Sequence, residues 1–190
     1  MDDIVKAAMA KWPNVPNCYG WLGLDARGNW YMRDDNAQAA GAFCAASAEP
    51  GRQAASKGSL LKHDKLIDFI QRNYAADAQG QWFFQNGPQR VFVELEATPF
   101  VWRVDVAPDF NVAAHTGQVA ITQRCIIDEH GRVYLETALG FGLVHTQDML
   151  QAAEAIEHGL WVPQEMPARD LQKRFGYVRS PEAVNKLLLK

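Results

Sequence analysis

Cysteine is scarce in this sequence, and its spacing forms no recognisable pattern. The three cysteines, Cys18, Cys44 and Cys125, are odd in number and lie far apart. This argues against a disulfide framework and is typical of a protein in a reducing compartment. We therefore expect a cytoplasmic location.

Long apolar runs and an excess of one charge are also missing. No apolar stretch approaches the ~20 residues that a membrane helix requires, and the first residues are acidic, unlike a signal peptide. Lys and Arg number 19 against 22 Asp and Glu, giving a net charge of −3. Nucleic-acid binding usually requires a basic surface. We expect neither a membrane nor a nucleic acid as a partner.

Motifs of catalysis, metal binding and cofactor binding are absent as well. The five histidines form no His-Glu-x-x-His, and neither Cys-x-x-Cys nor Gly-x-Ser-x-Gly occurs. The glycine pair Gly140 and Gly142 lacks the further glycine and the lysine of a phosphate-binding loop. The sequence thus predicts no catalytic residue, no metal ligand and no cofactor site.

The sequence does contain the composition of a globular protein, with 48% apolar and 22% charged residues among 190. Its densest aromatic and β-branched run predicts three strands, at Gln81–Gln85, Arg90–Glu96 and Val101–Val106. Alternation in the second strand predicts one buried and one solvated face. Pairing the second and third strands as a hairpin would place Glu94 opposite Arg103.

Helical patterns flank this run. The best helix is predicted over 59–74, with Leu66, Ile67 and Ile70 on its buried face, and a second over 147–158, capped by Thr146. An Ala-rich segment, 34–58, is predicted to be a mobile insertion, and 160–190 a C-terminal helical tail. We expect a single α+β unit spanning 1–190.

One turn pattern occurs three times. An Asp is followed three residues later by Gly, then by one polar and three large residues, beginning at Asp25, Asp77 and Asp128. The Asp can bond to the turn backbone, and Gly takes the left-handed conformation. The repetition predicts an antiparallel sheet built from duplicated β-hairpins, with helices packed on it.

The hairpin holding Trp21 and Trp30, the helix before Asp77, the run from Phe83 to Val104 and the hairpin at Gly131 together resemble proteobacterial families of unknown function. The resemblance covers most of the chain outside 34–58. It implies a repeated α+β architecture and, from related families, a role in signalling or ligand binding. It implies no catalytic residues.

Two features are candidates for binding: the turn after the first strand of the run, and the polar side chains of the next two strands. The turn offers amide groups, exposed backbone and one arginine, which suit an anionic or peptide ligand. The predicted ligand-binding residues are Gln85, Asn86, Gln89, Arg90, Glu94 and Arg103.

We therefore expect a non-enzymatic regulatory module that binds a small ligand or a protein, and a homodimer formed through a sheet edge or the tail. The alternative is a small hydrolase or lyase that uses the central carboxylates with His115. Ordinary ion pairs on a solvated face would look the same in the sequence.

Overall fold

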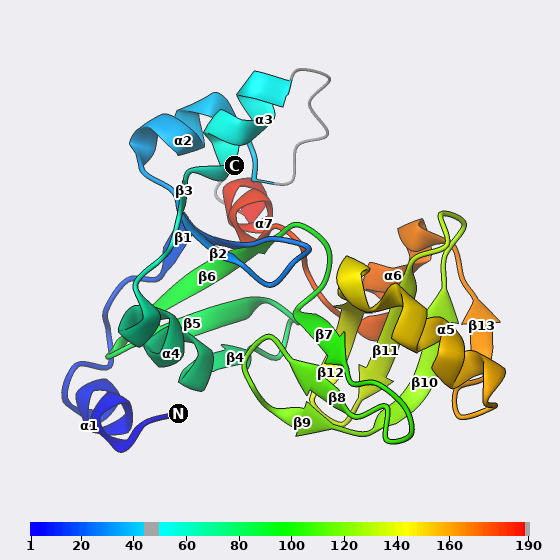
Figure 1. The fold of residues 1–190 in the computed structure, drawn as a ribbon. Coiled ribbons are helices and arrows are strands. Elements are labelled where there is room, and N and C mark those ends of the chain that lie inside the picture. Colours follow the sequence, from blue (N-terminus) through cyan, green and yellow to red (C-terminus); the bar gives the residue numbers. More distant parts are fainter. Residues whose placement is uncertain (44–49, 189–190) are drawn as a thin grey trace. The chain divides into compact units, whose positions relative to one another are not determined.

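The computed structural model describes residues 1–43 and 50–188 and has an α+β fold, as expected (Figure 1). The chain forms two compact units. The first consists of Met1–Asp25, Asn29–Glu96 and Tyr177–Lys190, and the second of Ala26–Gly28 and Ala97–Gly176. Each unit has its own sheet.

The first unit contains a six-stranded sheet in the order β3-β2-β1-β6-β5-β4. Its strands are β1 (Cys18–Leu24), β2 (Trp30–Met32), β3 (Ser59–Leu60), β4 (Tyr74–Ala76), β5 (Trp82–Asn86) and β6 (Gln89–Leu95). Its helices are α1 (Asp3–Lys11), α2 (Asp35–Ala40), α3 (Pro50–Lys57), α4 (Asp64–Arg72) and α7 (Pro181–Leu188). The central pair, β1 and β6, is parallel, and the other pairs are antiparallel.

The second unit contains a seven-stranded sheet in the order β13-β10-β11-β12-β7-β8-β9. Its strands are β7 (Phe100–Val104), β8 (Val112–Ala114), β9 (Val119–Ala120), β10 (Thr122–Ile127), β11 (Val133–Thr137), β12 (Gly140–Val144) and β13 (Pro163–Glu165). Its helices are the short 3₁₀ turn η1 (Thr146–Asp148), α5 (Met149–Glu157) and α6 (Ala168–Phe175). Two pairs, β10–β13 and β12–β7, are parallel.

The predicted hairpin between the second and third strands of the aromatic run is wrong. Those strands are β6 and β7, and they belong to different sheets. β6 pairs with β1 and β5, whereas β7 pairs with β8 and β12. The predicted solvated face of β6 is also wrong, because Phe92 and Glu94 are as buried as Val93 and Leu95. A central strand covered on both faces buries both sets of side chains.

The threefold turn is confirmed in detail. The carboxylates of Asp25, Asp77 and Asp128 each accept a hydrogen bond from the backbone N–H four residues on, at 2.8, 2.9 and 3.0 Å. The glycine of each copy has a positive φ, at 83°, 76° and 73°. Each turn joins two antiparallel strands, β1–β2, β4–β5 and β10–β11. In the second copy a short strand, β4, follows the helix predicted to precede the turn.

The predicted helices are shorter in the structure. The segment 59–74 holds β3, α4 and the start of β4, and of the predicted buried face only Ile70 is fully buried. The segment 147–158 holds α5, whose preceding turn is capped by His145 rather than by Thr146. The 34–58 segment contains α2 and α3, while residues 44–49 lie outside the described residues.

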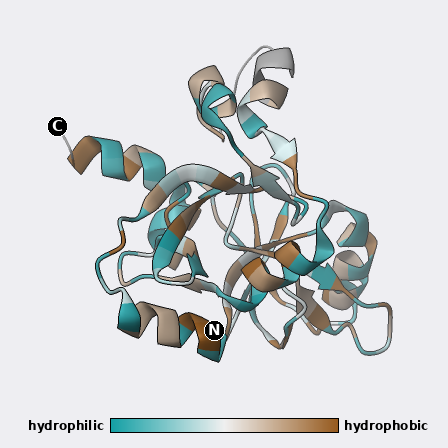
Figure 2. Cartoon of the chain, turned by 90° about the vertical axis from the view of Figure 1, so that its left-hand side faces the viewer, coloured by the Kyte–Doolittle hydropathy of each residue, from teal (hydrophilic) through white to brown (hydrophobic). Residues whose placement is uncertain are grey.

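Helix α7, in the predicted C-terminal tail, packs against β1 and β6 within the first unit. Helices α1 and α7 carry both hydrophobic and hydrophilic residues along their length, as helices with one packed face do (Figure 2). Within the described part of the chain, no helix combines the length and the hydrophobicity required to cross a bilayer.

Candidate functional site

A small hollow of about 270 Å³ lies in the first unit, beside the β5–β6 turn. Helix α1 and the loop after it form one wall, and the β5–β6 hairpin forms the other. The lining residues are Met9, Pro13, Val15, Asn17, Gln85, Pro88 and Arg90. Two of the predicted ligand-binding residues, Gln85 and Arg90, therefore line the same hollow.

The α1 wall is fixed by residues at both of its ends. At its start, the backbone N–H of Asp2 donates to Asn73 Oδ1 at 2.8 Å, and the Asp2 carboxylate pairs with Arg72 at 3.4 Å. The hydrogen bond that Asn73 Nδ2 donates to the Asp2 carboxylate lowers the pKa of Asp2, and the contact with Arg72 lowers it further. Asn73 is itself buried, at 1% exposure, so this anchor is tied to the core.

The loop after α1 is held by the opposite wall. Gln89 Nε2 donates to the carbonyl of Pro16 at 3.0 Å. At the tip of the hairpin, Gly87 has φ 57°, and a Cβ there would lie 3.8 Å from Ala8 of α1. Gly87 thus supplies the left-handed turn that brings the hairpin against the helix. Gln89 acts as a support for the hollow, and Asn86 is exposed at the turn.

Arg90 carries the positive charge of the hollow. Its guanidinium carbon lies over the Phe83 ring, 4.7 Å from the ring centroid, in a cation–π contact. No carboxylate among residues 1–43 and 50–188 forms an ion pair with Arg90. Its N–H groups are therefore available to an anion.

Gln85 supplies an acceptor. The side chain is 1% exposed, and its Nε2 donates to the carbonyl of Gly87 at 2.9 Å. That bond fixes the amide, and its Oε1 has no hydrogen-bond partner among the described residues. An unpartnered buried acceptor costs about 1–3 kcal/mol, so such groups are rare in folded proteins. A ligand that donates a hydrogen bond would remove this cost.

The remaining two predicted residues have other partners. Glu94 is fully buried, and its carboxylate accepts hydrogen bonds from Ser180 Oγ and from the backbone N–H of Glu182, at the start of α7. Arg103 lies in the second unit, where Nε and Nη2 donate to the two carboxylate oxygens of Asp148. Both residues therefore make structural contacts within their own units.

Sequence reasoning did not find the α1 wall. Met9, Pro13, Val15 and Asn17 carry no motif, and Pro13 signals only the end of a helix. Their place in the hollow depends on the contact between Asp2 and Asn73, which are 71 residues apart in the chain. No local pattern encodes a contact of that length.

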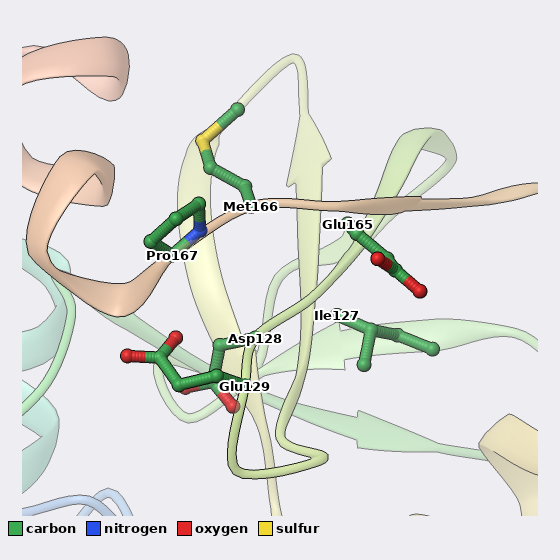
Figure 3. A pocket seen from close by; sticks show the side chains of 6 residues that line it. All are labelled: Ile127, Asp128, Glu129, Glu165, Met166 and Pro167. Atoms are coloured by element: carbon green, nitrogen blue, oxygen red, sulfur yellow. The ribbon is translucent and has the colours of Figure 1, made fainter.

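A larger hollow of about 530 Å³ lies in the second unit. Figure 3 shows its six lining residues, Ile127, Asp128, Glu129, Glu165, Met166 and Pro167. Two of its three acidic groups are already engaged: Asp128 accepts hydrogen bonds from Arg132 and Tyr134, and Glu129 accepts one from the backbone N–H of Ala168. No cluster of metal-ligating side chains occurs among the residues that the structure describes. The smaller hollow is therefore the better candidate for ligand binding, because the Arg90 guanidinium and the Gln85 acceptor both line it.

Comparison with known proteins gives one family and two similar solved structures. The family described as "Protein of unknown function (DUF2946)" matches residues 1–182. A DUF1285 family protein from Silicibacter pomeroyi DSS-3 is similar in structure, with a TM-score of 0.49 and 13% identity over 81% of this chain and 84% of that chain. A DUF1285 family protein from Shewanella baltica OS155 has a TM-score of 0.42 and 15% identity over 70% and 91%. No curated protein matches the sequence.

Proposed function

The chain belongs to a family of proteins of unknown function, and from that premise we propose that it is a non-enzymatic, cytoplasmic regulatory module that binds a small anionic ligand. The ligand occupies the hollow between α1 and the β5–β6 hairpin. One observation carries the proposal: two groups without partners among the described residues, the Arg90 cation and the buried Gln85 acceptor, line the same hollow.

The arrangement favours binding over catalysis. The alternative enzyme would use the central carboxylates with His115, but both carboxylate oxygens of Glu94 already accept hydrogen bonds at the start of α7, and Glu96 pairs with Lys57 at 2.8 Å. His115 Nδ1 accepts from the backbone N–H of Val101. A general base needs a lone pair directed at its substrate. The lining of the proposed site contains no Asp, Glu, His, Cys or Ser.

Native mass spectrometry of the purified protein tests the proposal. We expect a co-purified small molecule on the wild type, which is lost from Arg90→Ala. Arg174→Ala is the matched control, because Arg174 is exposed on α6 in the other unit. The control should retain the small molecule.

Titration with acetate, followed by amide NMR, gives a second reading that needs no co-purified ligand. Shifts should cluster at residues 85–90 in the wild type and in Arg174→Ala, and should disappear in Arg90→Ala. Acetate shifts that persist in Arg90→Ala would overturn the assignment of Arg90 to the site.

A further inference from the structure

The anion that the hollow can accept is small and singly charged. Among the described residues, Arg90 is the only ionisable side chain in its lining. The planar guanidinium can present two parallel N–H groups, which match the two oxygens of a carboxylate. Phosphate groups commonly bind several cations or the N-terminal end of a helix. The hollow offers one arginine and the opposite end of α1.

The second requirement is a hydrogen-bond donor close to the anion. Gln85 Oε1 can only accept, and the bond from Nε2 to the Gly87 carbonyl prevents the amide from turning to offer a donor instead. Residues from the last turn of α1 and from the loop after it, Met9 and Pro13, form the facing wall. The C-terminal end of a helix carries partial negative charge, which favours a positive group or an N–H donor.

The third requirement is a short apolar part. Met9, Pro13, Val15 and Pro88 supply the remaining large lining groups, and the two prolines have no backbone N–H to offer. The volume of about 270 Å³ lies below the roughly 300–1,000 Å³ of drug-sized sites. Such a hollow suits one amino-acid residue and is small for a nucleotide or a large cofactor.

Resting on the proposed function, we propose that the ligand is an α-amino acid with an apolar side chain, presented either as the free molecule or as the C-terminal residue of a peptide. Its carboxylate binds the Arg90 guanidinium, its α-nitrogen donates to Gln85 Oε1, and its side chain contacts Met9 and Val15. A free amino acid and a peptide end share this chemistry. They differ at the nitrogen, which is a charged ammonium in the free molecule and an uncharged amide N–H, attached to the rest of the chain, in the peptide.

Isothermal titration calorimetry with four probes tests this assignment. L-leucine has all three groups, N-acetyl-L-leucine retains an uncharged N–H, 4-methylpentanoate lacks the nitrogen, and L-leucinamide lacks the carboxylate. We expect L-leucine or N-acetyl-L-leucine to bind at least about tenfold more tightly than the last two, since each lost hydrogen bond to a charged or buried group is worth that much. Tighter binding of N-acetyl-L-leucine identifies a peptide end, and tighter binding of L-leucine identifies the free amino acid.

Two variants locate the binding. Arg90→Ala should weaken the tighter probe about tenfold to hundredfold, while Arg174→Ala should leave it unchanged. Gln85→Met should abolish the preference for the probe with nitrogen over 4-methylpentanoate. Equal binding of L-leucine, N-acetyl-L-leucine and 4-methylpentanoate by the wild type would overturn the ligand class, as would binding of none of them.

This failure is distinguishable from failure of the proposed function. If the ligand class is wrong but the hollow binds anions, acetate shifts will still depend on Arg90. If the hollow binds no ligand, neither acetate nor any of the four probes will distinguish Arg90→Ala from Arg174→Ala.

Discussion

At the scale of the residue, Gln85 links binding to stability. Gln85→Met removes an unpartnered acceptor, which costs about 1–3 kcal/mol, and one hydrogen bond worth about 0.5–1.5 kcal/mol. The ligand-free variant should therefore unfold at the same temperature as the wild type or higher. Thermal denaturation with and without L-leucine checks this. A variant clearly less stable without ligand would show that the amide serves the fold alone.

Glu94 gives a pH dependence. Burial raises the pKa of the Glu94 carboxyl, although hydrogen bonds from Ser180 and from Glu182 oppose the shift. A raised pKa means that the folded state holds the proton more tightly than the unfolded state does. The contribution of Glu94 to the stability of the fold is therefore fully present below about pH 4.3, the ordinary glutamate pKa. It is lost as pH rises through the higher pKa of the folded state.

Glu94→Gln removes this titration. We expect the free energy of unfolding of the wild type, minus that of Glu94→Gln, to fall as pH rises above about 4.3. Urea denaturation at a series of pH values measures this difference. A difference that stays flat, or rises with pH, would contradict the direction of the shift.

Asp148 contacts two neighbouring residues of strand β7, Arg103 and Val104. Besides Arg103, its carboxylate accepts from the backbone N–H of Val104 at 3.1 Å. Burial opposes ionisation of Asp148, but the bonds from Arg103 and Val104 outweigh it and lower the pKa. Asp148→Ala leaves a buried N–H unpartnered and should cost about 1–3 kcal/mol. Arg103→Ala should cost less, because Arg103 is 55% exposed. Chemical denaturation of both variants would show whether the order is reversed.

At the scale of the element, the carboxylate of Asp2 anchors the start of α1. Asp2→Ala should remove its contacts with Arg72 and with Asn73 Nδ2, while the backbone bond to Asn73 Oδ1 remains. Hydrogen exchange at the α1 amides should then become faster while β5 and β6 stay protected. Asp3→Ala is the control, since Asp3 pairs only with the exposed Lys6 in the same helix. Equal exchange in the two variants would show that α1 is held by other contacts.

The same scale shows what the sequence could and could not predict. The three Asp–Gly turns were predictable because every contact that defines them lies within a few residues. Strand β6 was predictable as a strand but not in its pairing, because alternation cannot distinguish a half-exposed strand from one covered on both faces. For the site, Gln85 and Arg90 were found through the turn, whereas the α1 wall depends on packing between distant segments.

At the scale of the whole molecule, the second unit contains a complete sheet. All seven strands of that sheet, β7 to β13, lie within residues 97–176. A fragment of these residues should therefore fold alone, with cooperative thermal unfolding and dispersed amide NMR signals. A fragment that gives collapsed, undispersed spectra would instead support the prediction that 1–190 is a single folding unit.

A homodimer stays a prediction at this scale. Strand β9 forms one edge of the second sheet. Val119 in this strand and Ile121 just after it are 71% and 85% exposed. Unpaired edges with apolar side chains favour association with another strand. Light scattering should give twice the 21.2 kDa chain mass, and Ile121→Lys should reduce it to that of one chain. A single-chain mass for the wild type at high concentration would contradict the prediction.

Helix α7 has a consequence for the order in which the protein is synthesised. The first unit includes residues 177–190, which follow the whole of the second unit in the chain. A ribosome therefore releases every strand of the second sheet before it makes the helix that covers Glu94. Until α7 is made, the Glu94 carboxylate and the apolar face of the first sheet stay uncovered, although the second unit is already able to fold. The first unit, begun before the second along the chain, is therefore completed only after it.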